Sequence, residues 1–186
     1  LATGNLENDW DNVNEALSKL ENTNLYMDDT AGITIGEIRS KCRRLANSEK
    51  GLDLVIIDYL QLIDSSSRYS GSRQQEVSEI SRALKTMALE LEVPVIALSQ
   101  LSRSVEKRED KKPVLSDLRE SGSIEQDADI VAALHAPDVE TPVGDEVPNP
   151  IQLIILKHRN GPTKTIDLLF KKKTSTFLSI KRDGGN

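Results

Sequence analysis

Two short apolar runs separated by one long helical pattern constrain the fold of this chain more than any other feature. The first run, at 52–57 (LDLVII), is rich in Val and Ile, which is typical of a strand buried on both faces of a parallel sheet, and the second starts at Pro94 (PVIALSQ). Between them, over about 74–91, apolar residues recur every three or four positions, as in an amphipathic helix. This order predicts a parallel strand, helix, strand unit.

The segments on either side extend this α/β pattern. We expect a helix that Asp9 caps and that ends at 22–24, followed by a short strand at 25–27. A second helix should begin after Thr34, which has capping-box spacing to Glu37, and end near Gly51. Further strands are predicted at 129–136, 151–157, 165–170 and 177–180, and short turns join the last of these.

The predicted fold class is therefore α/β, a mainly parallel sheet flanked by helices, with antiparallel edge strands at the C-terminal end. The chain of 186 residues fits one domain. Its expected parts are a lead-in (1–50), a parallel core (51–135), an exposed Pro-rich acidic loop (136–150), an antiparallel edge hairpin (151–182) and a tail (183–186).

Composition excludes several classes of protein. With 24 Lys and Arg against 30 Asp and Glu, the net charge is −6, so a polyanion would have to be held by local clusters. No apolar run approaches the length of a membrane span, and no secretory leader opens the chain. The single cysteine, Cys42, has no disulfide partner and lies on the apolar face of its helix. We expect a cytoplasmic protein in which Cys42 is a core thiol.

Polar residues at the ends of the two apolar runs are the first candidates for chemistry. Asp58 follows four apolar residues, the general form of a Walker B strand, and could hold Mg²⁺ through water. Gln100 follows the second run, and its amide could donate to a terminal phosphate oxygen. The alternatives are a carboxylate that caps a strand end and a polar residue with a structural role.

Two further segments carry candidate cations. In RESGS, Arg119 and the backbone N–H groups could contact a phosphodiester, and the alternative is a plain connection between helices. At the turn KHRNGP, alternation places Lys157 and Arg159 on one face and His158 on the other. The pair could reach a neighbouring subunit's nucleotide, or simply protect an edge strand. We interpret the basic residues between 103 and 112 as a solvated helix and loop.

One expected element is absent from these 186 residues. A nucleotide site of this class uses a loop of the form GxxxxGKS or GxxxxGKT, whose backbone N–H groups wrap the phosphates. No glycine in the chain precedes Lys followed by Ser or Thr, and NGPTKT has a different spacing. The chain alone is therefore not expected to bind ATP in the usual way.

In combination, several segments resemble one family, the DnaB-type replicative DNA helicases, and in particular their RecA-like motor domain. The matching segments are DDTAGITIGEIRSKCRRL, LVIIDYLQLI, RQQEVSEISRALK, PVIALSQLSR, LRESGSIEQDADIVA and KHRNGPTKT. The resemblance implies an ATP- and Mg²⁺-dependent homo-hexameric helicase that translocates on single-stranded DNA and unwinds duplex at the fork. Primase and a helicase loader are the implied protein partners, and no membrane is involved.

The resemblance also implies roles for individual residues. Asp58 matches the Walker B acid, and Gln100 matches the residue that senses the γ-phosphate. Arg119, Glu120 and Gly122 match a loop that follows the single-strand backbone, while Lys157 and Arg159 match a pair that acts on the adjacent subunit's ATP. The loop at 64–73 lies where the family has another channel-facing loop, and no contact is assigned to it.

This chain departs from the family pattern at its start. In the family, the phosphate loop and the Glu that activates water precede the TGN with which this chain opens. We therefore expect the C-terminal part of a helicase motor, inactive by itself. The alternative is a non-catalytic module that binds a helicase, a loader or DNA without hydrolysing ATP. A more distant alternative is a recombinase of the RecA class, which shares the sheet and the Walker B strand.

Overall fold

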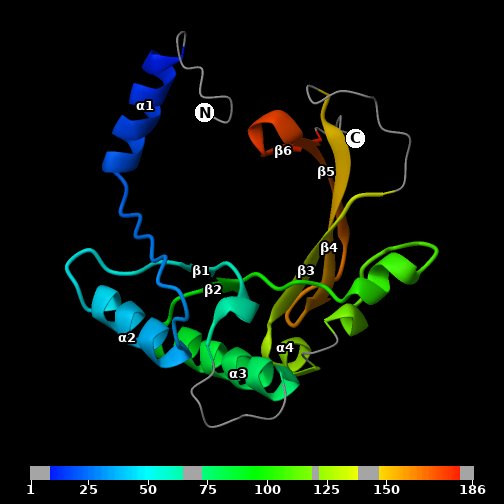
Figure 1. Cartoon of the computed structure of the whole chain (residues 1–186), viewed down its shortest axis with the longest axis horizontal. Coiled ribbons are helices and arrows are strands. Elements are labelled where there is room, and N and C mark those ends of the chain that lie inside the picture. The colour runs from blue at the N-terminus through cyan, green and yellow to red at the C-terminus, as the bar shows by residue number, and fades with distance from the viewer. Residues whose placement is uncertain (1–8, 65–72, 119–121, 138–146, 181–186) are drawn as a thin grey trace.

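The computed structural model of the chain describes residues 9–64, 73–118, 122–137 and 147–180. The helices are α1 (Trp10–Glu21), α2 (Ile35–Ala46), α3 (Arg73–Leu91) and α4 (Gly122–Asp127). The strands are β1 (Val55–Ile57), β2 (Val95–Ala97), β3 (Ile130–His135), β4 (Asn149–His158), β5 (Thr165–Lys171) and β6 (Thr176–Ser179) (Figure 1). Four 3-10 turns, η1 (Leu60–Leu62), η2 (Arg103–Lys107), η3 (Leu115–Asp117) and η4 (Lys172–Thr174), complete the order.

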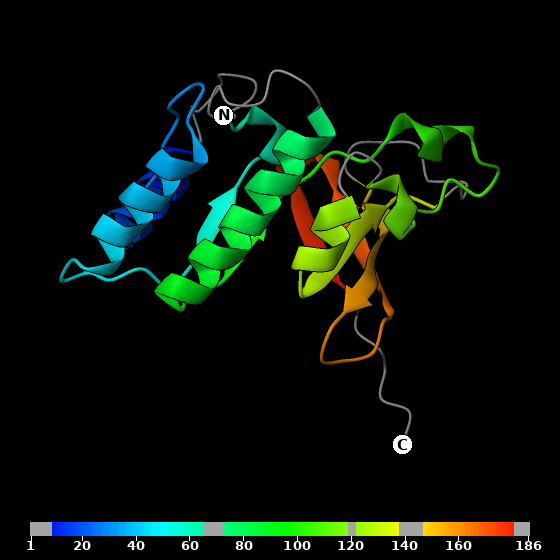
Figure 2. The same ribbon diagram turned by 90° about the horizontal axis from the view of Figure 1, so that it is seen from below.

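The predicted parallel unit is confirmed. β1 and β2 pair in parallel, with Val55 opposite Val95 and Ile57 opposite Ala97, and α3 connects them. In Figures 1 and 2, α2 and α3 lie side by side along this pair. The main core lies between them and contains Cys42 of α2, together with buried side chains of α3 and η1: Leu60, Ile63, Ile80, Leu84 and Met87. Cys42 is the core thiol that the sequence predicted.

The prediction that the run at 52–57 forms a strand buried on both faces is wrong for the residues that the structure describes. Side chains alternate across a strand, so Val55, Ile57 and Val95 pack against the core while Ile56 and Ile96 point to the opposite face. There, Ile56 is 62% exposed and Ile96 is 49% exposed. The helices α2 and α3 therefore cover one face of this strand pair and leave the other accessible.

The remaining strands form a four-stranded antiparallel sheet in the order β3, β4, β5, β6. The expected antiparallel strands at the C-terminal end are therefore present, and Phe170 and Phe177 pack across β5 and β6 with ring centroids 4.8 Å apart. The run at 129–136, placed in the parallel core by the sequence, instead has β4 as its hydrogen-bonded partner, antiparallel to it. Its alternating burial, with Val131 and Ala133 inside, is that of a strand covered on one side.

The two helices of the lead-in, α1 and α2, differ in how well their first residues match the predicted capping signals. The capping box at the start of α2 is present: Thr34 Oγ1 accepts from the Glu37 N–H, and the Glu37 carboxylate accepts from the Thr34 N–H at 2.8 Å. These bonds with Thr34 lower the pKa of Glu37. α1 begins after Asp9 as expected, but the Asp9 side chain makes no capping bond. The strand predicted at 25–27 is wrong, because that segment pairs with no described strand.

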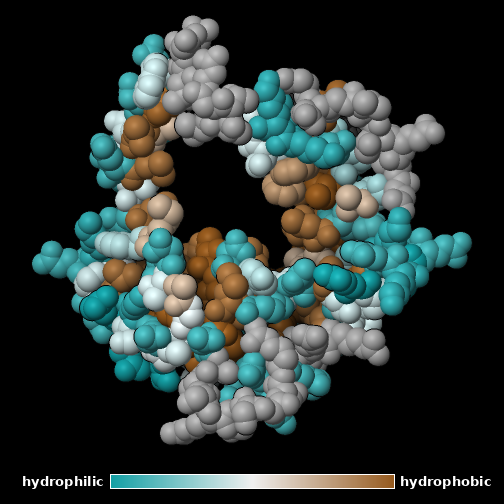
Figure 3. All heavy atoms as spheres, in the orientation of Figure 1, coloured by the Kyte–Doolittle hydropathy of each residue, from teal (hydrophilic) through white to brown (hydrophobic). Residues whose placement is uncertain are grey.

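Many large apolar side chains of the described residues are exposed. α1 buries none of its residues, and Trp10, Leu17 and Leu20 are each at least half exposed. Figure 3 shows hydrophobic residues along the inner rim between α1 and the β4–β6 sheet.

Among the described residues, no helix has both the length and the apolar character needed to cross a bilayer.

Candidate active site

The carboxyl ends of β1 and β2 bring Asp58 and Gln100 together. The strand ladder continues past β1 and β2, since the Leu98 N–H donates to the Ile57 carbonyl at 2.9 Å and the Leu60 N–H donates to the Leu98 carbonyl at 2.9 Å. The two segments therefore leave the sheet side by side. A hollow of about 350 Å³ lies there, lined by Asp58, Tyr59, Leu98, Ser99 and Gln100. Residues that are far apart in sequence thus share one site, at the edge of the sheet where ligands bind in this class of fold.

Gln61 belongs to this region, although its sequence context does not single it out. Gln61 lies in η1, directly after the hollow, and its Nε2 donates to Ser99 Oγ at 3.1 Å. This bond joins the segment that follows β1 to the segment that follows β2. No local pattern distinguishes Gln61 from the other polar residues of the chain, and only the parallel pairing shows which residue it contacts.

The hollow has a donor set that suits part of a magnesium nucleotide. Mg²⁺ in nucleotide sites is usually held by one or two carboxylates and by phosphate oxygens, with water filling the other positions. Asp58 supplies one carboxylate, and the Ser99 hydroxyl and Gln100 amide supply hydrogen-bond donors. These residues fit a cation and a terminal phosphate. The described residues contain no group of three or more acidic, His or Cys side chains that could bind a metal unaided.

An ion pair with a buried carboxylate organises the segment between β2 and α4. Arg108 donates through both terminal nitrogens to Asp117, at 2.8 and 2.6 Å, and the Val114 N–H donates to the same carboxylate at 2.8 Å. Burial would raise the pKa of Asp117, but the bonds from Arg108 and Val114 hold it below its ordinary value. The Ser102 N–H also donates to the Asp117 carbonyl at 2.9 Å. The pair therefore ties the chain just after Gln100 to the chain just before α4.

This ion pair corrects part of the sequence interpretation. The sequence groups Arg108 with a solvated basic patch, but its guanidinium contacts a carboxylate that is only 2% exposed. The two residues lie nine positions apart with no continuous helix or strand between them, so no local signal pairs them. The Asp117 pKa is lowered and the Arg108 pKa is raised by their mutual hydrogen bonds.

Lys157 and Arg159 lie on the same side of the sheet end, as alternation predicted. Both contact the C-terminal end of α4 instead of projecting from the hairpin. Lys157 Nζ donates to the carbonyls of Glu125 and Ala128, the latter at 2.8 Å, and Arg159 Nη2 donates to the Gln126 carbonyl at 3.1 Å. A helix end leaves carbonyls without intrahelical partners and carries partial negative charge, which attracts cations.

Asp129 joins this pair to α3. Its carboxylate accepts from Lys85 Nζ at 2.5 Å through one oxygen and lies 3.1 Å from Arg159 Nη1 through the other. Its backbone carbonyl also accepts from the Arg159 N–H at 2.8 Å. The hydrogen bond from Lys85 and the charges of Lys85, Arg159 and Lys157 outweigh burial and lower the pKa of Asp129. No local pattern in the sequence gives Asp129 or Lys85 this role.

The turn that follows β4 holds His158 against a glycine. A Cβ added to Gly161 would overlap the His158 ring, so the ring packs directly on the glycine backbone. Only a residue without a side chain leaves room for the ring there. The expectation that His158 points away from Lys157 and Arg159 is consistent with this contact.

The predicted DNA-contacting residues are positioned in the sequence at the start of α4 and just before it. Arg119 and Glu120 lie outside the described residues, as do 65–72 of the predicted second loop. Gly122 is the first residue of α4. The predicted DNA contacts therefore end where α4 begins.

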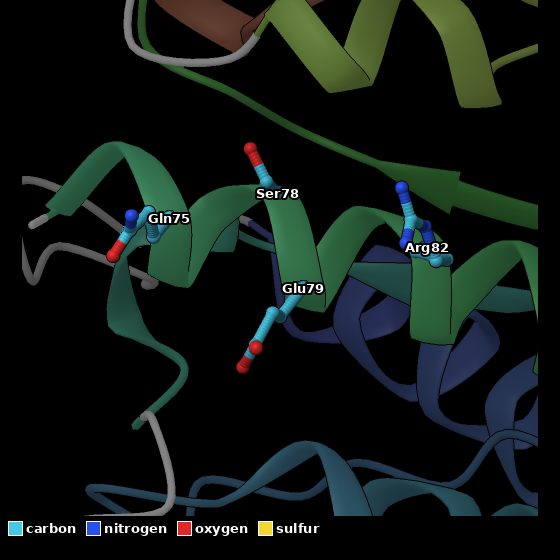
Figure 4. Close-up of a pocket in the computed structure, with 4 residues that line it drawn as sticks. All are labelled: Gln75, Ser78, Glu79 and Arg82. Carbon is cyan, nitrogen blue, oxygen red and sulfur yellow. The ribbon is translucent and has the colours of Figure 1, made fainter. Parts of the chain in front are cut away.

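A second hollow, of about 280 Å³, is less suited to chemistry. It is lined by Gln75, Ser78, Glu79 and Arg82, which all belong to α3. Figure 4 shows Ser78 and Glu79 pointing in opposite directions from the helix. These side chains do not converge on one point.

The parallel strand pair, the helices beside it and the antiparallel sheet match the RecA-like fold that the sequence predicted, and comparisons with known proteins support this assignment. The sequence profile described as the DnaB-like helicase C terminal domain matches residues 1–179. This chain belongs to that family.

Individual relatives support the assignment. The chain is 56% identical over 186 residues to the replicative DNA helicase DnaC of Bacillus subtilis (strain 168), covering 98% of this chain and 40% of the relative. It is 55% identical over 183 residues to the replicative DNA helicase DnaB of Geobacillus stearothermophilus, with the same coverage. The chain thus spans 40% of the length of these relatives.

Two solved structures share its fold. One is a DnaB-like replicative helicase, described with its interactions with primase, at a TM-score of 0.84 and 42% identity, covering 94% of this chain and 42% of that chain. The other is described as an ATPase domain, at a TM-score of 0.85 and 41% identity, covering 97% of this chain and 63% of that one.

Proposed function

We propose that residues 1–186 act as the C-terminal part of the motor in an ATP-dependent replicative DNA helicase that translocates on single-stranded DNA and unwinds duplex at the fork. The observation that carries this proposal is the shared hollow of Asp58 and Gln100 at the ends of neighbouring parallel strands, in a chain of this family. ATP, when bound with Mg²⁺, supplies the phosphoanhydride whose hydrolysis drives movement.

The residues of the hollow have distinct roles in this proposal. The Asp58 carboxylate holds the cation, most simply through water, and places it beside the terminal phosphate. The Gln100 amide donates to an oxygen of that phosphate, so that its position depends on whether the phosphate is present. Gln61 keeps Ser99 in place next to it through the bond at 3.1 Å.

The cations of the sheet end act on a neighbouring copy. In a homo-hexameric ring, Lys157 and Arg159 reach the nucleotide of the adjacent subunit and stabilise negative charge that develops during phosphoryl transfer. Arg119, Glu120 and Gly122 contact the backbone of single-stranded DNA in the channel. A ring gathers cations from six copies in the channel, so an overall charge of −6 per chain is compatible with DNA binding. Primase and a loader are the proposed protein partners in the bacterial cytoplasm.

The deciding experiment compares variants of the full-length protein that carries this segment. Arg159→Ala should lower DNA-stimulated ATP turnover by about 10³-fold or more, the usual contribution of a trans-acting arginine. Asp167→Asn is the matched control, because Asp167 lies on the same sheet and its carboxylate accepts from Gln152 at 3.0 Å, away from α4. Full turnover by Arg159→Ala would contradict the proposed role of this residue.

A second candidate is a non-catalytic module that binds a helicase, a loader or DNA without hydrolysing ATP. The same experiment separates the two. If the unmodified full-length protein shows no DNA-stimulated ATP turnover, the module is the better description and the helicase proposal fails.

A further inference from the structure

The C-terminal end of α4 holds the side chains of Lys157 and Arg159. Lys157 reaches three carbonyls there, those of Glu125, Gln126 and Ala128, and Arg159 reaches the Gln126 carbonyl at 3.1 Å. All of these acceptors belong to the last turn of α4 or to the residue after it. The position of both side chains therefore depends on where this helix ends.

Asp129 also holds Arg159 in place. It contacts Arg159 through both a side-chain oxygen and its backbone carbonyl, while Lys85 of α3 holds the other side-chain oxygen. The Asp129 side chain is 53% exposed, so this network is accessible to solvent and contributes little to overall stability. The Asp129 carboxylate lies between Lys85 of α3 and Arg159 after β4, so it can fix where the Arg159 guanidinium lies.

The opposite end of α4 adjoins the predicted DNA contacts. α4 runs from Gly122 to Asp127, so its six residues span about 9 Å along the axis. Ile124, in its first turn, packs against the main core, which holds the helix against α3. A short helix thus separates the end of the proposed DNA-contacting segment from the carbonyls that hold Lys157 and Arg159.

We infer that α4 and Asp129 position Lys157 and Arg159, so that displacement of α4 by bound DNA moves the two cations relative to the neighbouring subunit's nucleotide. Asp129 is the positioning residue and Lys85 is its support on α3. This inference rests on the proposed function and adds to it a route by which DNA binding controls hydrolysis. α4 and the sheet end of β4 are the elements that change their relative position.

The test measures ATP hydrolysis by the full-length protein with and without single-stranded DNA. Asp129→Asn keeps the size of the side chain but removes its charge. Because misplacing a reacting group by about 1 Å costs up to about 10²-fold, we expect a loss of about tenfold in DNA-stimulated kcat, with KM for ATP changed less than about twofold. Asp129→Glu should recover most of the rate. Lys85→Gln should cost about twofold to threefold, since it removes the support and leaves Arg159 its carboxylate.

The readout that separates positioning from a general structural role is the ratio of the rates with and without DNA. Asp129→Asn should lower this ratio, whereas Asp167→Asn should leave it unchanged. The inference is overturned if Asp129→Asn keeps full DNA stimulation, or if it lowers both rates by the same factor. Should Asp129→Asn fail to fold, as judged by its thermal transition, Lys85→Gln carries the test, and an unchanged ratio in that variant overturns the inference.

Arg159→Ala distinguishes this failure from failure of the proposed function. If Arg159→Ala loses activity while Asp129→Asn does not, Arg159 acts in hydrolysis without Asp129, and only the inference is wrong. If Arg159→Ala itself keeps full activity, the proposed trans-acting role is wrong.

Discussion

Replacing Asp117 by Asn should destabilise the chain by about 2–4 kcal/mol, because it removes the charge from a buried, fully hydrogen-bonded carboxylate. Asp117 is 2% exposed and accepts two bonds from Arg108 and one from the Val114 N–H. Asn preserves the volume and keeps one acceptor, but its NH₂ group faces the guanidinium. One of the two hydrogen bonds from the Arg108 guanidinium is lost, and in the other the acceptor oxygen no longer carries a charge.

The magnitude follows from two limits. A net hydrogen bond to a charged group contributes about 1.5–3 kcal/mol, and removing one partner of a buried ion pair costs about 3–5 kcal/mol. The Arg108 side chain is 34% exposed and regains water when Asp117 loses its charge, which places the change between these limits. With a urea m-value of about 2 kcal/mol per molar, the midpoint should fall by about 1–2 M.

The assay is urea unfolding of the 186-residue chain followed by circular dichroism, repeated across pH. The folded-state pKa of Asp117 is lower than that of the unfolded chain, about 3.9. The contribution of this carboxylate is therefore complete above about pH 5 and is lost as the pH falls through the folded-state pKa. The difference between wild type and Asp117→Asn should shrink over that range. A midpoint shift below about 0.3 M at pH 7, or a difference that grows in acid, would refute the reasoning.

Three further predictions address the site and the core. The purified 186-residue chain should show negligible Mg²⁺-dependent ATP turnover in a phosphate-release assay, since it lacks a phosphate loop, and sustained turnover would contradict this. Burial raises the pKa of the Cys42 thiol, so Cys42 should react with a thiol reagent at pH 8 at least about tenfold more slowly in the native chain than in urea, and equal rates would show that α2 is not packed. Thr34→Ala should lower the free energy of unfolding by about 1 kcal/mol through loss of the capping box, and Thr34→Ser, which keeps the hydroxyl, should lower it less.

Much of the local structure could be predicted because it depends on neighbouring residues. The capping box at Thr34, the buried face of α3 and the turn at Gly161 each follow from short-range spacing, and each is present. Predictions that depended on pairing with a distant strand were less accurate. The segment at 25–27 has strand-forming residues but no described neighbour to pair with, and the strand that begins at Ile130 pairs with β4 and not with the parallel unit.

The sequence by itself determined which residues could carry chemistry: Asp58 and Gln100 at strand ends, and Lys157 and Arg159 two positions apart on one face. The reason is that strand periodicity and residue type are local properties of the chain. The tertiary structure alone decided what these residues contact. Parallel pairing placed Asp58 and Gln100 in one hollow. Lys157 and Arg159 donate to the carbonyls at the end of α4, and Arg159 also pairs with Asp129. Such contacts join residues that are distant in sequence, and they depend on how whole elements pack and not on any short-range pattern.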